Sequence, residues 1–290
     1  IRLHGLQNFV ADFPSPMTRP TAHSGTPAAE VLPEPAALLP LLHAYHDRDS
    51  FISDDAIREV SLRLGIPLAE LFGTVTFYQH FSRGEPGKSA PRVCTGPVCC
   101  LHGAEKLLDG LRPKGASAMP CAGRCDEPIP VLVGDDVLVG LDVGHLQSGP
   151  SPLPTPNPGG HEECVFASIR EPRRAELEGY RRTGGYEAIA SAVAELTPAQ
   201  VIELIDESGL AGRGGAGFPT GQKWRAVAEA PGTPKSIICN ADEGEPGCFK
   251  DRAILDYDPH AVIEGMLLAA YATGATRGFI YLRYEYPHTM

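Results

Sequence analysis

The sequence lacks the features that identify several classes of protein. Acidic residues outnumber lysine and arginine, and the formal net charge is −11, so the chain has no general excess of the cations that neutralise nucleic-acid phosphates. No apolar run approaches the roughly 20 residues that a membrane-spanning helix needs. We therefore expect no nucleic-acid binding and no direct membrane span. The expected location is cytoplasmic, and a peripheral position on a membrane complex is an open alternative.

A secretory signal pattern is also missing at the start of the sequence. Without it, the eight cysteines are better explained by metal or cluster binding in a reducing compartment than by a disulfide framework. The first residue is isoleucine, and the last ten residues, YLRYEYPHTM, read as a strand that runs into a turn. We therefore expect a fragment that is open at both ends.

Length and composition predict two α/β domains. The chain has 290 residues, of which 42% are hydrophobic, enough for two ordinary cores. Residues 1–33 are rich in proline, threonine and small residues and predict a flexible lead-in. Residues 147–160 are rich in proline and glycine and predict a linker. The expected domains are therefore residues 34–146 and 161–290.

The first domain shows helices followed by a small α/β unit. Helices are predicted at residues 36–45, 53–64, 66–72 and 101–111, and strands at 92–94, 129–133 and 137–141. Ser53 is the expected N-cap of the second helix.

The second domain is also mixed. Helices are predicted at residues 186–195, 198–208, 222–229 and 260–272, and strands at 236–240 and 279–282. Thr197 is the expected N-cap of the helix that begins at residue 198.

Four cysteines of the first domain form two pairs, Cys94 with Cys99 and Cys121 with Cys125. A [2Fe–2S] cluster has two irons that each take two thiolates, so two separated pairs match it. Structural zinc sites more often use C-x2-C turns, although the spacing alone leaves zinc open. The other cysteines are expected outside the site, Cys100 as a neighbour of Cys99 and the last three as packing residues: Cys100, Cys164, Cys239 and Cys248.

Helices that lead into VCTGPVCCLHGAEKL, followed by CAGRC and a strand pair, resemble the thioredoxin-like [2Fe–2S] subunit of NADH:quinone oxidoreductase, respiratory complex I. The same module occurs in NAD-reducing hydrogenases and NAD-dependent formate dehydrogenases. The resemblance implies that the cluster ligands are Cys94, Cys99, Cys121 and Cys125.

A glycine-rich loop, GLAGRGGAGFPTGQKW, dominates the second domain. Gly212, Gly214 and Gly217 satisfy G-x-G-x-x-G, but the preceding VIELIDESGL has helical periodicity, which argues against a Rossmann fingerprint. Glycine still lets the backbone approach a ligand, and successive N–H groups form an anion-binding nest. The loop therefore predicts contact with a phosphate or a planar cofactor, and a mobile surface linker is the alternative.

A second loop lies within SIICNADEGEPGCFKD, where Asn240, Asp242, Glu243 and Glu245 can bond ribose or flavin polar atoms. The two loops together closely resemble the flavin-binding, NADH-oxidising subunit of complex I. The resemblance implies that FMN binds at Gly212, Arg213, Gly214, Lys223, Asn240 and Asp242. It implies that NAD contacts Phe218, Glu243 and Glu245.

Two positions depart from the pattern of the family. Ala226 stands where family members often have a second aromatic residue, and Tyr284 follows Arg283 where a glycine is common. At the second position this sequence looks more like the hydrogenase and formate dehydrogenase relatives.

The resemblance implies an NADH dehydrogenase that passes electrons from NADH through FMN to iron–sulfur clusters. The chemistry belongs to the cofactors, so no catalytic side chain is named. A [4Fe–4S] cluster is expected only in a missing C-terminal part, partner iron–sulfur subunits are expected, and the fragment alone should bind FMN poorly. An electron-input module of a formate dehydrogenase or hydrogenase remains open. So do a ferredoxin-like carrier and a zinc-stabilised interaction module.

Overall fold

The computed structural model describes residues 37–148 except 128 and 135, residues 159 and 160, and residues 163–289 except 287. The predicted lead-in, residues 1–33, and most of the predicted linker, residues 149–158, lie outside the described residues. The chain divides into two compact units. In the described residues, the cysteine unit comprises residues 37–148 and 244–248, and the glycine-loop unit comprises residues 159–160, 163–243 and 249–289.

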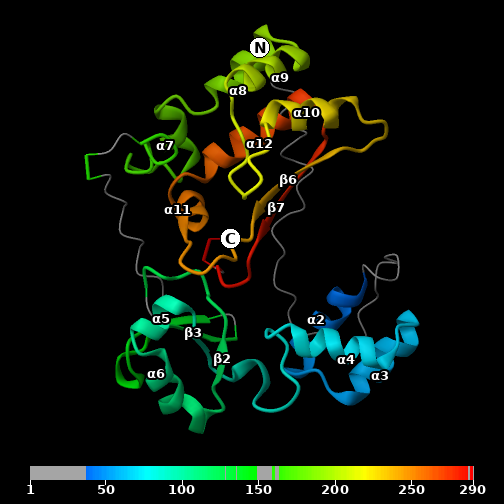
Figure 1. Ribbon diagram of the computed structural model, residues 1–290, viewed down its shortest axis with the longest axis vertical. Coiled ribbons are helices and arrows are strands. Elements are labelled where there is room, and N and C mark those ends of the chain that lie inside the picture. Colours follow the sequence, from blue (N-terminus) through cyan, green and yellow to red (C-terminus); the bar gives the residue numbers. More distant parts are fainter. Residues whose placement is uncertain are drawn as a thin grey trace. The chain divides into compact units, whose positions relative to one another are not determined.

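The cysteine unit opens with three helices around their own core (Figure 1). These are α2 (Leu38–Asp49), α3 (Asp54–Leu64) and α4 (Leu68–Phe77). The Ser53 hydroxyl accepts from the Ala56 N–H at 3.1 Å, which confirms the predicted cap of α3. The α4 helix continues five residues beyond the predicted end at residue 72, because Val75 packs into the same core as Leu71.

A mixed five-stranded sheet follows, with strand order β2-β1-β3-β4-β5. The strands are β1 (Arg92–Cys94), β2 (Ser117–Met119), β3 (Pro130–Val133), β4 (Asp136–Val139) and β5 (Gln147–Ser148). Strand β1 pairs with β2 in parallel and with β3 antiparallel, and β3 and β4 form the predicted hairpin. The sequence did not predict β2 or β5, and β5 extends regular structure two residues into the predicted linker.

The helix predicted at residues 101–111 is divided in two. Helix α5 (Pro97–Leu101) begins with Pro97 in its first turn, and α6 (Ala104–Leu111) follows. Between them Gly103 takes a φ of 89°, a left-handed conformation that interrupts the helix. One face of α6 packs on the sheet through Leu107 and Leu111, so the sheet and the helix share one core.

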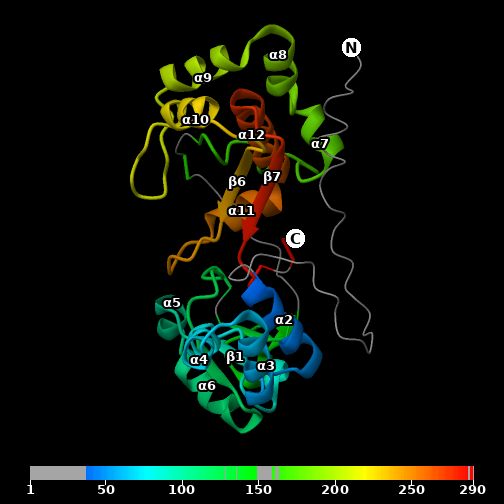
Figure 2. The ribbon, with the colours of Figure 1, turned by 90° about the vertical axis from the view of Figure 1, so that its right-hand side faces the viewer.

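The glycine-loop unit contains six helices and two strands among its described residues (Figure 2). The helices are α7 (Leu177–Arg182), α8 (Glu187–Glu195), α9 (Pro198–Glu207), α10 (Thr220–Glu229), α11 (Lys250–Tyr257) and α12 (Pro259–Thr273). Strands β6 (Ser236–Ala241) and β7 (Arg277–Leu282) pair in parallel over six residues. Helix α12 packs against both strands and against α9 and α10. Among the described helices, none is long and apolar enough to cross a lipid bilayer.

The starts of α9 and α8 are stabilised in different ways, α9 by a local capping motif and α8 by contacts from a distant helix. Thr197 and Gln200 form a reciprocal capping box at the start of α9, which confirms Thr197 as its N-cap. The start of α8 is held from α12, where the buried Glu264 accepts from the backbone N–H groups of Tyr186 at 2.9 Å and Ile189 at 3.2 Å.

Candidate cluster and nucleotide sites

The four predicted ligand cysteines come from the strand, helix and loop at one end of the small sheet. Cys94 ends β1, Cys99 lies in α5, and Cys121 and Cys125 lie in the loop after β2. Cys94, Cys99 and Cys121 are buried, and Cys125 is half-buried. The fold thus collects four thiols that are separated by up to 31 positions in the sequence.

The sulfur atoms lie close together and receive backbone hydrogen bonds. The Sγ atoms of Cys121 and Cys125 are 3.5 Å apart. The Ala122 N–H donates to Cys94 Sγ at 3.4 Å, and the Gly123 N–H donates to Cys121 Sγ at 3.4 Å. Backbone amides in such positions stabilise thiolate charge.

Gly96 is required by close packing against the second cysteine pair. A Cβ atom added at Gly96 would lie 2.9 Å from Cys121 Cβ and 3.1 Å from Cys121 Cα. Any side chain at this position would therefore displace Cys121.

The thiols differ in how readily they lose a proton. A hydrogen bond from the Cys99 thiol, helped by the amides of Gly96 and Ala122, lowers the pKa of Cys94 to about 6 against the effect of burial. Cys99 donates this bond, and both the bond and burial raise the pKa of its thiol. Burial and the bond to Cys121 raise the pKa of Cys125 to about 11. The hydrogen bonds at Cys94 thus favour its thiolate form, and a bound cation would displace the remaining thiol protons.

The four thiols contact one another through both cysteine pairs. Cys94 bonds with Cys99 and with Cys121, and Cys121 lies against Cys125. Among the described residues, no group of three or more His, Cys, Asp or Glu side chains is preformed as a metal site. Two pairs with amide donors on the sulfurs fit a [2Fe–2S] cluster.

The remaining cysteines stay outside this group, and none of the eight cysteines, all of which the structure describes, forms a disulfide. Cys100 points away, since its Sγ donates to the Thr95 carbonyl at 3.2 Å. Cys239 and Cys248 are half-buried, as packing residues can be. Cys164 is exposed, so the expectation that it is a packing residue is wrong.

The glycine-rich loop is a bare backbone loop closed at its base. The Gly212 N–H donates to the Phe218 carbonyl at 2.9 Å and the Thr220 N–H donates to the Leu210 carbonyl at 2.8 Å. Helix α9 precedes the loop, so the absence of a Rossmann strand is confirmed. The α10 helix begins directly after it, and no side chain caps its first turn.

Internal packing does not explain every glycine of the loop. Gly215 and Gly217 have φ values of 111° and 61°, which favour glycine. Gly214 has no such φ, and a Cβ atom added there would meet nothing within 4 Å among the described residues. Its missing side chain leaves exposed backbone that a flat or phosphate-bearing ligand can contact, and Arg213 beside it is exposed as well.

Asn240 and Asp242 lie where β6 ends. In parallel strands this carboxyl edge is the usual position for ligand-binding loops. The Asn240 Oδ1 accepts from the Asp242 N–H at 3.1 Å, which folds the start of the loop back on the strand. Asn240 is exposed and Asp242 is half-exposed, so both can face a ligand.

Glu243 has a different position from the one expected for an NAD contact. Its side chain is fully buried, and its carboxylate accepts from the N–H groups of Asp251 at 2.8 Å and Arg252 at 3.2 Å. Tyr286 adds a hydroxyl at 3.3 Å. The carboxylate therefore caps α11, and the expectation that it contacts NAD is not supported by its geometry.

Glu243 also anchors the end of the described chain. Its carbonyl accepts from Arg283 Nη1 at 2.7 Å, and Arg283 pairs with Glu285 at 2.9 Å. The pKa of Arg283 is raised because the bond and charge of Glu285 outweigh burial. No local pattern predicts the bond between Arg283 and the Glu243 carbonyl, since the two residues are 40 positions apart.

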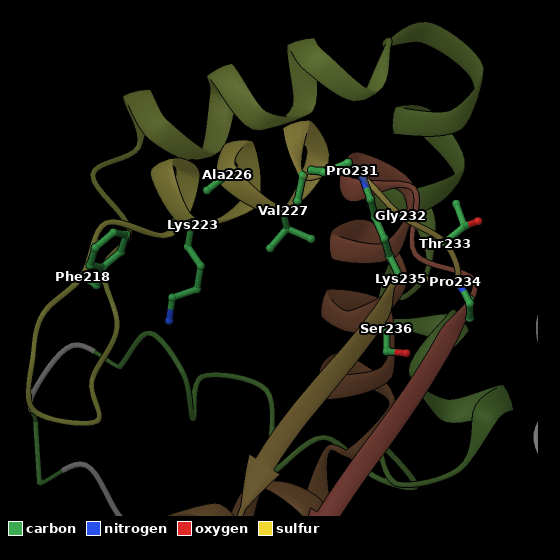
Figure 3. Close-up of a pocket in the computed structure, with 11 residues that line it drawn as sticks. Phe218, Lys223, Ala226, Val227, Pro231, Gly232, Thr233, Pro234, Lys235 and Ser236 are labelled. Carbon is green, nitrogen blue, oxygen red and sulfur yellow. The ribbon is translucent and has the colours of Figure 1, made fainter.

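A pocket of about 660 Å³ lies beside the glycine loop (Figure 3). Phe218 stands at one end with Lys223, whose Nζ is 5.8 Å from the centre of the Phe218 ring. The floor is formed by Ala226 and Val227, and residues 230–236 close the other end. An aromatic face, a cation and an apolar floor are what a nucleotide base with its phosphate would use.

The structure thus brings only some of the predicted nucleotide residues together. Phe218 and Lys223 share the pocket, whereas Asn240 and Asp242 lie at the end of β6 and do not line it. Glu245 is exposed and belongs to the segment Gly244–Cys248 of the cysteine unit. The turn at residues 230–236, which closes the pocket, was not recognised from the sequence.

Comparison with protein families assigns both halves of the chain. Residues 28–120 match the model of the thioredoxin-like [2Fe–2S] ferredoxin family. Residues 205–290 match the model of the Nuo51 FMN-binding domain.

Individual relatives agree with this division. One of the NADH-quinone oxidoreductase subunits of Rhizobium meliloti strain 1021 is 50% identical over 125 residues, which are 43% of this chain and 30% of that protein. NAD-reducing hydrogenase HoxS subunit alpha of Cupriavidus necator is 32% identical over 261 residues, which are 81% of this chain and 43% of that protein. The chain therefore spans less than half the length of these relatives.

A solved structure is similar across both units. The crystal structure of an NAD⁺-reducing [NiFe]-hydrogenase in the air-oxidized state matches with a TM-score of 0.63 and 27% identity. The match covers 86% of this chain and 47% of that one. These similarities confirm the α/β class and the thioredoxin-like domain predicted from the sequence.

Proposed function

We propose that this chain, which joins a thioredoxin-like [2Fe–2S] ferredoxin domain to a Nuo51-type FMN-binding domain, is the electron-entry part of an NADH-dependent oxidoreductase. The observation that carries the proposal is the pairing of four thiols beneath backbone amides at one end of a small sheet. FMN, when bound, couples the two-electron chemistry of NADH to the one-electron chemistry of iron–sulfur clusters. The protein's own task is then to hold and orient these groups.

In this proposal Cys94 and Cys99 hold one iron and Cys121 and Cys125 hold the other. The division follows the two pairs in the sequence, and the members of each pair are in contact, although Cys94 also bonds Cys121 across the pairs. The amides of Ala122 and Gly123 already point at two of the sulfurs. They would continue to neutralise the charge of those sulfurs in a bound cluster.

FMN is assigned to the glycine loop and the end of β6. The exposed backbone at Gly214 and the half-exposed backbone at Gly212 accept the close approach of a flat ring or a phosphate, and Arg213 and Lys223 supply positive charge. The open first turn of α10 adds the positive end of a helix dipole. Asn240 and Asp242 offer an amide and a carboxylate for flavin or ribitol groups.

NAD is assigned to the half-exposed ring of Phe218 and to Glu245. The Phe218 ring lines the pocket of about 660 Å³ and is 49% exposed, so one face is free for a base. The exposed Glu245 carboxylate can accept ribose hydroxyls. Glu243 belongs to the same loop, but its carboxylate caps α11, so its side chain is not assigned to NAD.

A hydrogenase-type module is the second candidate. The HoxS subunit alpha aligns with 81% of this chain, whereas the Rhizobium meliloti relative aligns with 43%. One relative thus carries counterparts of both domains in a single chain. This favours the arrangement of an NAD-reducing hydrogenase, or of a formate dehydrogenase, over a separate complex I subunit.

Partner iron–sulfur subunits and a peripheral position in a larger complex belong to the proposal. The relatives are named as subunits of multi-subunit enzymes. Whether electrons go on to a quinone-reducing complex or to a hydrogenase partner would be decided by co-purification from the native host.

The test is reduction of the cluster by NADH. We expect the chain, supplied with enough excess FMN to offset the weak binding expected of it, to show the visible absorption of a [2Fe–2S] cluster that NADH bleaches. Bleaching by dithionite but not by NADH plus FMN would favour the ferredoxin-like carrier. Bound zinc without iron would favour the zinc-stabilised interaction module and contradict the proposal.

A further inference from the structure

A buried ion pair lies in the loop that carries the second pair of cysteines. Arg124 Nη1 is 2.6 Å from Glu127 Oε2, and the two side chains are 1% and 4% exposed. Taking two charges out of water is costly, and an apolar pair of similar size would often be as stable. A buried pair at this position therefore needs a reason other than stability.

The exposed pair Asp109 and Arg112 of the same unit provides a contrast. It has the same three-residue separation and a distance of 2.8 Å, but its side chains are more than 60% exposed. A pair of that kind contributes little to stability and is screened by solvent. The burial of Arg124 and Glu127, and not the pairing itself, is the unusual feature.

The position of the pair connects it with the sulfurs. Arg124 lies between the two cysteines of the second pair and adjoins Cys125 in the sequence. The loop turns at this point, since the Glu127 N–H donates to the Arg124 carbonyl at 2.9 Å. Just before the turn, the amides of Ala122 and Gly123 donate to sulfurs. Arg124 and Glu127 thus stand within two residues of Cys125, and the burial of both side chains leaves their charges weakly screened.

We propose that the Arg124–Glu127 pair is a redox-tuning element of the cluster, with each charge cancelling the effect of the other on the reduction potential. The inference rests on the proposed binding of a [2Fe–2S] cluster by the four cysteines. Reduction adds one electron to the cluster and breaks no bond. A nearby positive charge favours the reduced cluster and a nearby negative charge disfavours it. With both charges present the potential lies between the two extremes.

The test is a set of neutral variants of the full chain. Arg124→Gln leaves the Glu127 carboxylate and should lower the potential, whereas Glu127→Gln leaves the guanidinium and should raise it. We expect each shift to change the ratio of reduced to oxidised cluster at least tenfold at a fixed solution potential, which is about 59 mV for one electron. The double variant should lie between the single variants. Asp126 is kept in every variant, so its contribution cancels in the comparison.

The matched controls are Asp109→Asn and Arg112→Gln, which remove the same charges at the exposed pair. We expect less than a twofold change in the ratio for both. The measurement is a titration with dithionite and mediators, followed by the electron paramagnetic resonance signal of the reduced cluster. A purely structural role would lower the melting temperature of both single variants without moving their potentials in opposite directions.

Shifts of the same sign in the two single variants, or shifts no larger than those of the controls, would overturn the inference and leave the proposed function intact. A wild-type chain with no iron and no acid-labile sulfide would overturn both. If a single variant loses its cluster, the iron that each variant retains against a chelator is measured instead. The double variant should then retain more iron than either single variant, and Arg124→Lys should retain as much as wild type. Equal loss in the double variant would overturn the inference.

Discussion

The two candidate sites differ in how completely the described chain builds them. At the cysteine site the protein itself supplies three buried thiols and one half-buried thiol, amide donors on sulfur, and a glycine at position 96, where Cys121 leaves no room for a side chain. At the glycine loop the backbone is exposed, and nothing among the described residues fills the space beside Gly214. A metal centre needs converging ligands held by local structure, whereas the contacts to a large nucleotide come from separate segments. The first kind of site should tolerate change poorly, and the second should lose affinity without losing the fold.

The largest effect is expected from a comparison of two adjacent cysteines. Cys99→Ala removes a buried thiol of the first pair, whereas Cys100→Ala removes a thiol whose Sγ donates to the Thr95 carbonyl. We expect the first variant to lose nearly all bound iron and the second to keep it, as measured by iron and acid-labile sulfide per chain. Equal iron in the two variants would remove Cys99 from the ligand set.

A smaller but clear effect is expected at Gly96. The added methyl group of Gly96→Ala would lie 2.9 Å from Cys121 Cβ, and overpacking of this kind typically costs about 1–3 kcal/mol. We expect a lower melting temperature and faster loss of iron to a chelator. Gly73→Ala in α4 is the control, since its Cβ meets nothing within 4 Å among the described residues. An unchanged cluster lifetime in Gly96→Ala would show that the site is looser than its contacts indicate.

The open site predicts the opposite pattern for Gly214→Ala. No atom of the described chain would meet the new methyl group within 4 Å, so the melting temperature of the FMN-free protein should stay the same. FMN affinity should fall by roughly tenfold, equivalent to about 1.4 kcal/mol, because the methyl group stands between the ligand and the backbone. Flavin fluorescence quenching measures the affinity. Gly265→Ala in α12, whose Cβ likewise meets no described atom within 4 Å, is the matched control, and equal affinities in the two variants would count against the loop as the FMN site.

The smallest effect concerns pH and the helices before the sheet. Burial lowers the pKa of His46 to about 4 and that of His80 to about 3, whereas an unfolded histidine titrates near 6.5. As the pH falls below about 6.5, these two histidines bind protons in the unfolded chain but stay neutral in the folded chain. Stability is therefore complete above that pH and declines toward pH 4.

The measurement is the free energy of unfolding by urea between pH 7.5 and pH 5. His46→Gln should give a shallower decline than wild type, because a neutral amide can still accept the Ser82 N–H that His46 Nε2 accepts at 3.1 Å. The exposed His102 is the control, and His102→Gln should keep the wild-type slope. Identical slopes in all three proteins would mean that the buried histidine does not govern the acid response.

The sequence predicted what local patterns encode. Ser53 and Thr197 mark helix starts because their side chains bond the chain three residues on, and the cysteine spacing marks the cluster loops. Strand β2 and helix α11 were missed, since β2 (Ser117–Met119) has no β-branched or aromatic residue and α11 is capped by Glu243 from an earlier loop. The position of Glu243 was misjudged for the same reason. The ion pair of Arg124 and Glu127 was not recognised, because sequence does not reveal that both charges are buried.

The most direct test of the account is the metal content of the purified full chain. We predict about two irons and two acid-labile sulfides per chain, together with an electron paramagnetic resonance signal that appears on reduction. One zinc per chain, with neither iron nor such a signal, would contradict the account at its centre.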